Sequence, residues 1–142
     1  MRKCILLISL LSLSSPVFLQ PSHKEVYTEL LKHNILNPFV VLQQCIAETG
    51  CGSQGVGKTK NNLFGFKNKS GYKHYKNWKE SVKDYAIWQC KWYDKHLQEK
   101  HTPYDECDYY HFLWTYGYVD GISCSSRSMK YVEYIKKMRP RI

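Results

Sequence analysis

The amino-acid sequence predicts one mostly α-helical domain that carries a small β-hairpin. Its 142 residues are enough for a single domain with an apolar core of its own. Several stretches repeat apolar residues at intervals of three and four, which is the spacing of one buried helix face. Capping residues and glycines mark where these stretches begin and end, and one short aromatic run folded about a turn is typical of a hairpin.

Residues 1–20 have the features of a secretory signal peptide. Two basic residues precede an apolar run from Cys4 to Leu13, and small polar residues follow it. The apolar run is too short to span a bilayer. We therefore expect cleavage between Ser14 and Gln20, export to the periplasm or the medium, and a catalytic domain over residues 21–142.

The most informative stretch is the helix expected over Pro38–Thr49. Asn37 can cap it, its first residue is a proline that suits a first turn, and Gly50 ends it. Glu48 lies on the apolar stripe of this helix, seven residues after Val41. Apolar neighbours and the negative end of the helix dipole both disfavour an ionised carboxylate, which predicts a raised pKa for Glu48 and suits a general acid. The alternative is a partly exposed glutamate in a last turn.

The other elements follow from the same signals. A capping box at Ser22 and Glu25 starts a first helix that ends near Asn34, and the glycine-rich stretch after Gly50 is expected to be irregular. The remaining elements are a hairpin over Phe64–Tyr75, helices over Asn77–Leu97 and Cys107–Tyr116, a break at Gly117–Gly121 and a final helix from Ser128.

The long helix over Asn77–Leu97 has an apolar face and a polar face. Asn77 and Glu80 form a cap-like pair at its start, and Asp84 is expected to be a solvated charge. Trp88 lies off the apolar stripe, in a position to border a groove.

The stretch from Gly52 to Thr59 matches the phosphate-loop pattern G-x4-G-K-T letter for letter. A phosphate loop follows a buried strand and opens a helix, whereas this stretch follows the Glu48 helix and continues into Asn61–Gly65. We therefore expect no nucleotide to bind.

Charge and composition limit the classes of partner. The formal charge is +9 at pH 7, and the +7 that remains without the leader suggests an anionic partner such as nucleic acid, an acidic wall polymer or a membrane surface. The basic residues are scattered rather than gathered on one helix face, so we expect no nucleic acid. Aromatic residues make up 15% of the chain, with twelve tyrosines, a composition that suits both an aromatic core and contact with sugar rings.

Five of the six cysteines lie outside the leader. In an oxidising compartment an odd number leaves at least one thiol free or paired between chains. We expect a disulfide between Cys107 and Cys124, because they flank the turn after Tyr116, and we expect Cys45 to be a buried, small apolar residue. Clustered Cys and His residues with metal-ligand spacing are absent from the sequence, so we expect no metal and no other cofactor.

Four motifs occur in a characteristic order. They are Glu48-Thr49-Gly50, then Asn61-Asn62-Leu63-Phe64-Gly65, then Tyr72 and Tyr75 with the run Trp78-x-Glu80-Ser81-Val82-x-x-Tyr85, and last Gly117-Tyr118-x-Asp120. Together they resemble the glucosaminidase-type peptidoglycan hydrolases of glycoside hydrolase family 73, over the chain from Val26 to Met138. The resemblance implies a lysozyme-like, mostly helical fold with a small hairpin lobe beside a substrate groove. It also implies cleavage of the β-1,4 bond after N-acetylglucosamine in bacterial cell-wall glycan.

Carried over residue by residue, the resemblance implies roles for several positions. Glu48 matches the catalytic acid of the family, and Tyr118 matches a tyrosine that faces it. Residues Asn62, Phe64 and Gly65 match the motif that shapes the groove floor, and Tyr72, Tyr75 and Trp88 are candidates for contact with sugar rings. For the hairpin aromatics, packing within the hairpin is an equal alternative.

The chain departs from the family pattern in two places. It has no Asp or Glu between Leu63 and Asn77, where some relatives offer a second carboxylate, and a glycine follows Asp120 where the family usually has Asp-Pro. Glycosidases normally use two carboxyl groups, with substrate-assisted enzymes as an exception. The second catalytic group is therefore either Asp120 as a base or the 2-acetamido group of the substrate, positioned by Tyr118.

The leading hypothesis is an exported, monomeric endo-β-N-acetylglucosaminidase that acts on peptidoglycan glycan strands with Glu48 as general acid. The first alternative is a lytic transglycosylase of the same fold, which also needs one dominant acid. The second alternative is a non-catalytic cell-wall glycan-binding module.

Overall fold

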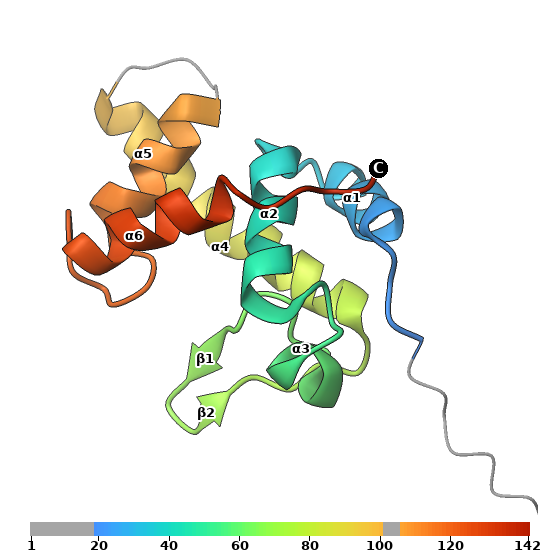
Figure 1. Cartoon of the computed structure of the whole chain (residues 1–142). Coiled ribbons are helices and arrows are strands. Elements are labelled where there is room, and N and C mark those ends of the chain that lie inside the picture. The colour runs from blue at the N-terminus through green and yellow to red at the C-terminus, as the bar shows by residue number, and fades with distance from the viewer. Residues whose placement is uncertain (1–18, 101–105) are drawn as a thin grey trace, which may run out of the picture.

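The computed structural model describes residues 19–100 and 106–142. Its elements are α1 (His23–Lys32), α2 (Pro38–Thr49), α3 (Gly55–Lys60), β1 (Lys67–Asn68), β2 (Gly71–Tyr72), α4 (Trp78–Lys100), α5 (Glu106–Tyr116) and α6 (Ser126–Ile135). The predicted fold class is confirmed: the domain is mostly helical, with one antiparallel hairpin. Helix α2 lies in the middle and packs against α1, α3, α5 and α6, while the hairpin and α3 lie beyond its C-terminal end (Figure 1).

Helix α2 has the bounds expected from the sequence, and Val41, Leu42 and Cys45 are fully buried. Gly50 ends it in the left-handed conformation, and the Gly50 N–H donates to the Ile46 carbonyl. The predicted cap is wrong. Asn37 has a left-handed backbone and caps nothing with its side chain, because its amide donates instead to the Tyr93 hydroxyl at 3.3 Å.

The predictions for the segments before and after α2 differ in accuracy. The capping box that starts α1 is confirmed: the Ser22 Oγ accepts from the Glu25 N–H, and the Glu25 carboxylate accepts from the Ser22 N–H at 2.7 Å. The stretch after Gly50 is not irregular throughout, as predicted, because Gly55–Lys60 forms the short helix α3. Glycine disfavours a helix locally, but the packing of Gly55–Lys60 against α2 stabilises the helical conformation.

Helix α4 begins where the sequence indicated, with the Asn77 Oδ1 accepting from the N–H groups of Lys79 and Glu80. The interpretation of Asp84 as a solvated charge is wrong. Its carboxylate accepts from the Lys73 ammonium at 2.7 Å and from the Tyr75 hydroxyl at 2.5 Å. These two contacts fasten the second half of the hairpin to α4.

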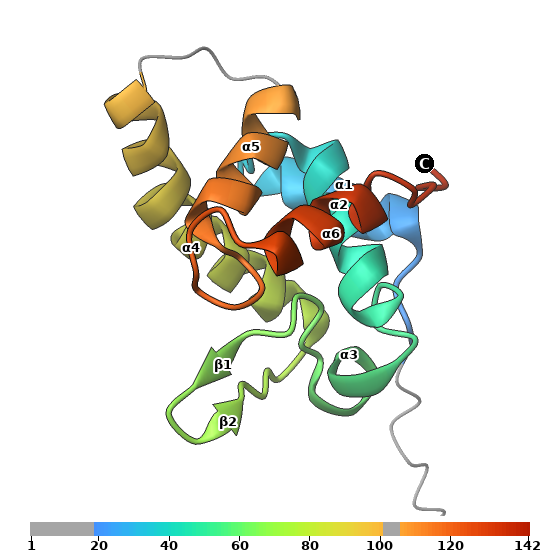
Figure 2. The same cartoon turned by 60° about the vertical axis from the view of Figure 1, so that its left-hand side comes forward.

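Helices α5 and α6 pack against each other beside α2 (Figure 2). Helix α5 ends at Tyr116, as expected. Helix α6 starts two residues before the predicted Ser128, because Ser125 is the cap and its Oγ accepts from the Ser128 N–H at 3.0 Å. Val132 and Ile135 of this helix are buried in the core.

The segment between α3 and the hairpin is held by buried amide side chains. The Asn62 amide donates to the carbonyls of Phe66 at 2.8 Å and Lys73 at 3.0 Å, and its Oδ1 accepts from the Phe66 N–H at 2.9 Å. Asn61 donates to the carbonyls of Tyr75 and Lys76. The hairpin has only two residues in each strand, so these side chains, rather than the strand ladder, fix its position.

Four cysteines are free thiols in the structure. Cys45 and Cys51 are fully buried at the end of α2, as expected for Cys45, and the Cys51 N–H donates to the Cys45 carbonyl at 3.1 Å. The predicted disulfide to Cys107 is not shown, since Cys124 is an exposed thiol and the side chain of Cys107 lies outside the described part of the chain.

Within residues 19–100 and 106–142, none of the helices combines the length and the apolar character needed to cross a bilayer.

Replacement of Asn62 by Ala is expected to lower the free energy of unfolding by about 1–3 kcal/mol, because the fully buried Asn62 side chain loses its three hydrogen bonds to the backbone of Phe66 and Lys73. Urea denaturation measures this change. Gln98→Ala is the control, since Gln98 is exposed on α4 and its loss should change stability by less than about 0.5 kcal/mol. Equal effects of the two substitutions would contradict the anchoring role of Asn62.

Candidate active site

A groove of about 590 Å³ lies between the C-terminal end of α2, the hairpin and the turn after α5. Its lining comes from several elements: Ala47 and Glu48 of α2, residues 64–67 and Tyr72, Trp88 of α4, residues 116–119 and 121, and Tyr131 and Tyr134 of α6. Phe64, Gly65, Tyr72, Trp88 and Tyr118 are thus brought together with Glu48, as the sequence predicted.

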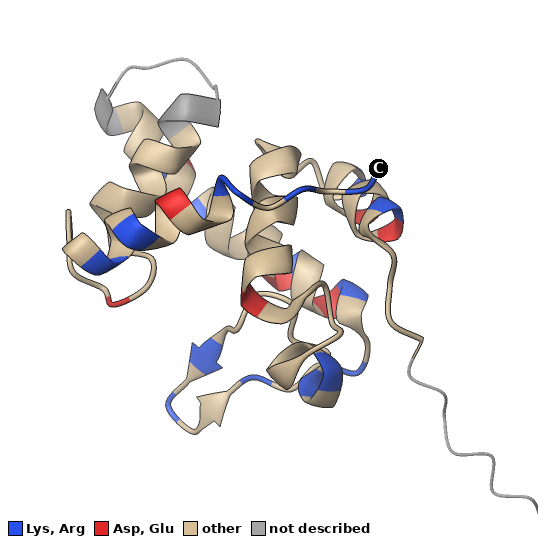
Figure 3. Ribbon diagram, in the orientation of Figure 1, with Lys and Arg blue, Asp and Glu red and all other residues tan. Residues whose placement is uncertain are grey.

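Glu48 lies in the last turn of α2 and is the only acidic residue of that helix. Figure 3 shows a red, acidic segment at the C-terminal end of α2 and blue, basic segments on the hairpin. Among the described residues that line the groove, Glu48 is the single carboxylate. Among these residues, Glu48 is therefore the one carboxylic acid that could give a proton to a bound ligand.

The neighbouring Thr49 joins the end of α2 to the floor of the groove. Its hydroxyl is buried, donates to the Leu63 carbonyl at 2.9 Å and accepts from the Gly52 N–H at 3.2 Å. The Leu63 N–H in turn donates to the buried Ser81 hydroxyl of α4 at 3.3 Å. These bonds hold the backbone at Phe64 and Gly65, which forms the groove floor, in position relative to Glu48.

The surroundings of Glu48 favour its protonated form. Its side chain is open to the groove, but protein atoms surround it on most sides, and this desolvation raises its pKa. The Tyr131 hydroxyl and then the Lys67 ammonium act in the opposite direction and lower the pKa of Glu48, without cancelling the effect of burial. The raised pKa predicted from the sequence is therefore supported by the structure, with burial as the main cause.

Gly65 leaves room for the Glu48 carboxyl. A Cβ at this position would lie 3.3 Å from the Glu48 Oε2, and the backbone φ of +68° is one that residues with a side chain rarely adopt. Position 65 thus favours glycine for a steric reason, because the backbone there lies close to the Glu48 carboxyl.

Aromatic rings form the wall of the groove opposite the hairpin. The Trp88 ring meets the rings of Tyr116 and Tyr118 edge-on, with centroids 5.5 Å and 5.4 Å apart. The Tyr118 hydroxyl donates to the Phe64 carbonyl at 3.4 Å, a long bond that ties the wall to the floor. Burial and then the charge of Glu48 raise the pKa of Tyr118 well above its usual range, so its hydroxyl stays protonated as a donor.

Three of the predicted site residues do not line the groove. Asn62 is fully buried below the floor, and the Tyr75 hydroxyl points to Asp84. The Asp120 carboxylate accepts from the Ile122 N–H and the Ser125 hydroxyl, both at 3.1 Å, so it forms a turn. These three residues therefore support the segments that line the groove without lining it themselves.

Two groups beside Glu48 were not predicted. Lys67 of β1 lies over the ring of its cross-strand partner Tyr72 at 4.6 Å and faces the groove. Tyr131 of α6 lies four residues before Ile135, so it shares the inward face of the predicted last helix. That spacing was available in the sequence, but nothing in the sequence placed this face of α6 against Glu48.

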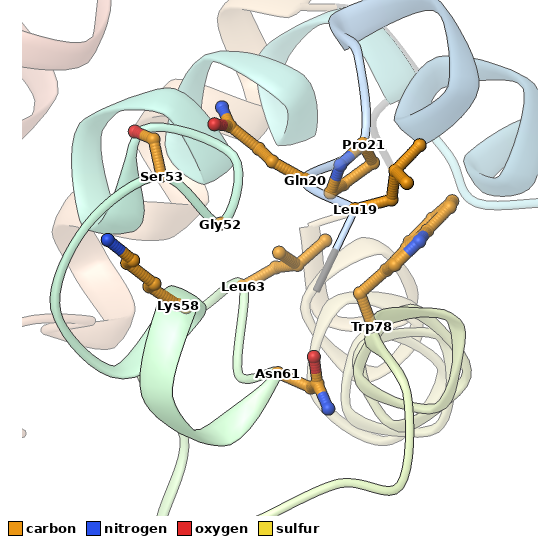
Figure 4. Close-up of a pocket in the computed structure, with 10 residues that line it drawn as sticks. Leu19, Gln20, Pro21, Gly52, Ser53, Lys58, Asn61, Leu63 and Trp78 are labelled. Atoms are coloured by element: carbon orange, nitrogen blue, oxygen red, sulfur yellow. The ribbon is translucent and has the colours of Figure 1, made fainter. Parts of the chain in front are cut away.

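The stretch that matches a phosphate loop borders a separate cavity of about 140 Å³ (Figure 4). Leu19, Pro21, Leu63 and Trp78 give this cavity an apolar side. A Cβ on Gly57 would lie 2.6 Å from the Thr49 Cβ, so this glycine allows α3 to approach α2 closely. Packing thus accounts for the glycine, and the stretch follows a helix, as expected, rather than a strand.

Among the described residues, no three His, Cys, Asp or Glu side chains gather into a set that could hold a metal ion.

A mostly helical domain with a small antiparallel hairpin is consistent with a lysozyme-like fold. The model of the glucosaminidase family, described as mannosyl-glycoprotein endo-beta-N-acetylglucosaminidase, matches residues 24–141, and the chain belongs to this family of glucosaminidase-type hydrolases. Searches among curated proteins and among solved structures found no match.

Glu48→Gln is expected to raise the melting temperature near pH 7 and to leave it unchanged near pH 3. Burial raises the pKa of Glu48 above its unfolded value, so the wild-type fold loses stability as pH rises through the folded-state pKa, whereas glutamine loses none. Scanning calorimetry at both pH values measures the effect. Glu133→Gln, on an exposed residue of α6, is the control and should show no such gain. A wild-type protein as stable as Glu48→Gln at pH 7 would contradict the raised pKa.

Proposed function

We propose that this protein is an exported endo-β-N-acetylglucosaminidase that cleaves the β-1,4 bond after N-acetylglucosamine in peptidoglycan, with Glu48 as the general acid. The observation that carries the proposal is the single carboxylate among the described residues that line the groove, which lies at a helix end where desolvation raises its pKa. Family membership supports the glycan substrate. The leader expected over residues 1–20 supports export.

In the proposed reaction, Glu48 gives its proton to the glycosidic oxygen, and the bond between this oxygen and the anomeric carbon breaks. The second group is the 2-acetamido substituent of the substrate, whose carbonyl oxygen attacks the anomeric carbon before water replaces it. The turn geometry of Asp120 supports this route, because Asp120 does not line the groove and its Oδ1 accepts from both the Ile122 N–H and the Ser125 hydroxyl. Tyr118, which lines the groove close to Glu48, is the candidate to orient the acetamido group.

The positive charge of the chain supports a wall substrate. Lys67 faces the groove, and further basic residues lie on the hairpin, α3 and α6 (Figure 3). Peptidoglycan carries carboxylates on its peptide stems, so these lysines would attract it over a range set by the ionic strength.

A digest of purified peptidoglycan tests the function. The expected products, read by mass spectrometry after reductive labelling, end in reduced N-acetylglucosamine. Muramic-acid ends would reassign the bond, and 1,6-anhydro ends would assign a lytic transglycosylase. A protein that binds the glycan without releasing fragments would be a binding module.

Glu48→Gln is expected to reduce turnover by about 10²–10⁴-fold, because the amide fills the same space but cannot donate the proton. The wild-type rate should fall at alkaline pH as Glu48 ionises, at a pH above that expected for an ordinary glutamate. Turnover of labelled glycan measures both effects, and calorimetry confirms that the variant is folded. A folded variant that keeps more than about a tenth of the wild-type rate would exclude Glu48 as the acid.

Tyr118→Phe is expected to slow cleavage more than Asp120→Asn does. The first change removes a hydroxyl from the groove, whereas the second alters a turn outside it. The same glycan assay on both folded variants gives the ranking. The reverse ranking would assign the second catalytic role to Asp120.

A further inference from the structure

The Tyr131 hydroxyl has an unusual position for a buried polar group. Its ring stacks on the Tyr118 ring, with centroids 5.5 Å apart and planes at 16°, and lines the groove. The hydroxyl is inaccessible to solvent and makes no hydrogen bond of standard geometry with any described residue. Such groups are rare in folded proteins and call for a physical explanation.

Two polar groups of α2 approach this hydroxyl, the Glu48 carboxyl and the Gln44 amide. They lie four residues apart and so occupy the same face of α2, towards α6. The Gln44 Nε2 is also buried without a hydrogen bond of standard geometry. The three groups therefore form a short polar row behind the groove, with Glu48 at its open end.

A chain of hydrogen bonds fixes the orientation of Gln44. It starts at the backbone of Leu36, whose N–H donates to the Gln89 Oε1 at 2.7 Å and whose carbonyl accepts from the Gln89 Nε2 at 2.9 Å. The same Nε2 donates to the Tyr109 hydroxyl at 3.2 Å, and that hydroxyl is bonded to the Tyr85 hydroxyl. The Tyr85 hydroxyl donates to the Gln44 Oε1 at 2.5 Å.

Counting protons gives each bond of this chain a direction. The one proton of Tyr85 goes to the Gln44 Oε1, so in the bond between the two tyrosines Tyr109 is the donor. The oxygen of the Gln44 amide is then occupied, and its Nε2 faces Tyr131 as a donor. The Tyr131 oxygen can accept from Gln44, which leaves its own proton for Glu48.

We propose that Tyr131 is the positioning residue of the acid, donating to the inner oxygen of the Glu48 carboxyl and leaving the outer oxygen to carry the proton into the groove. Gln44 orients Tyr131, and the chain from Leu36 orients Gln44. This inference rests on the proposed function for its role in catalysis, whereas the contact itself does not depend on the reaction. We expect these bonds to shorten when the groove is filled, as catalytic hydrogen bonds often do.

The other groups that face Glu48 interact with it through charge. They are the Lys67 ammonium from β1, the Tyr118 hydroxyl from the turn after α5 and the Cys45 thiol one turn earlier on α2. Lys67 lowers the pKa of Glu48, whereas burial and also the charge of Glu48 raise the pKa of Tyr118 and of Cys45. Of the described groups that face Glu48, Tyr131 is the one hydrogen-bond donor to it, and this contact opposes the effect of burial on the Glu48 pKa.

The test is the titration of Glu48 in Tyr131→Phe, followed by carbon-13 NMR of the glutamate carboxyls in the full chain without substrate. Glu48→Gln assigns the signal. Loss of the donor should raise the pKa of Glu48, and the alkaline limb of the rate profile should move to higher pH in the same direction. We also expect kcat to fall by about tenfold or more, with KM within about twofold, since hydrogen bonds to charged groups are the strong ones.

Tyr110→Phe is the matched control. Its hydroxyl also bonds a glutamine of α2, the Gln43 Oε1 at 2.5 Å, and Tyr110 does not line the groove. The Glu48 titration should be unchanged in this variant. A Glu48 titration that is equally unmoved in Tyr131→Phe would overturn the proposal. Because the titration needs no substrate, a wild-type protein inactive on peptidoglycan would refute the proposed function without affecting this readout.

Gln44→Met tests the orienting step. Methionine has a similar shape but offers no donor to Tyr131, so the Tyr131 proton should be less well directed and the Glu48 pKa should rise, by less than in Tyr131→Phe. Calorimetry verifies folding. A folded Gln44→Met variant with the wild-type titration would overturn the role of the chain that starts at Leu36.

Discussion

The hydrogen bond from the Thr49 hydroxyl to the Leu63 carbonyl is the contact on which the site depends. It joins the end of the helix that carries the acid to the segment that forms the groove floor, and both partners are buried. Glu48 precedes Thr49, and Phe64 and Gly65 follow Leu63, so one bond sets the distance between acid and floor. The hairpin depends on the same segment, because Asn62 holds its two halves through Phe66 and Lys73. Regular strand pairing contributes little, since each strand has two residues.

The pKa of Glu48 reflects opposing effects that come from different parts of the chain. Burial at the end of α2 raises its pKa, whereas Tyr131 from α6 and Lys67 from β1 lower it. A general acid needs effects that raise its pKa as well as effects that lower it, since it has to hold a proton at the working pH and then release it. The groove therefore brings together elements far apart in sequence around a single ionisable group.

Local sequence signals predicted the helices and the position of Glu48 well. Capping at Ser22 and Asn77, the stop at Gly50 and the apolar stripe of α2 depend on neighbouring residues, and the structure has them as predicted. The errors concern contacts across the chain. Asn37 bonds Tyr93 instead of capping α2, and Asp84 bonds Lys73 and Tyr75 instead of water. The place of Tyr131 beside Glu48 likewise depends on how α6 packs on α2, which spacing along one helix does not reveal.

The location of Glu48 at the C-terminal end of α2 has a consequence for the later half of the proposed reaction. As the glycosidic bond breaks, the sugar ring gains oxocarbenium character and the anomeric carbon becomes positive. The end of a helix carries partial negative charge from its backbone carbonyls, and the newly ionised Glu48 adds a full one. In the proposed reaction, the C-terminal end of α2 thus presents a negative field to the cation that forms after proton transfer.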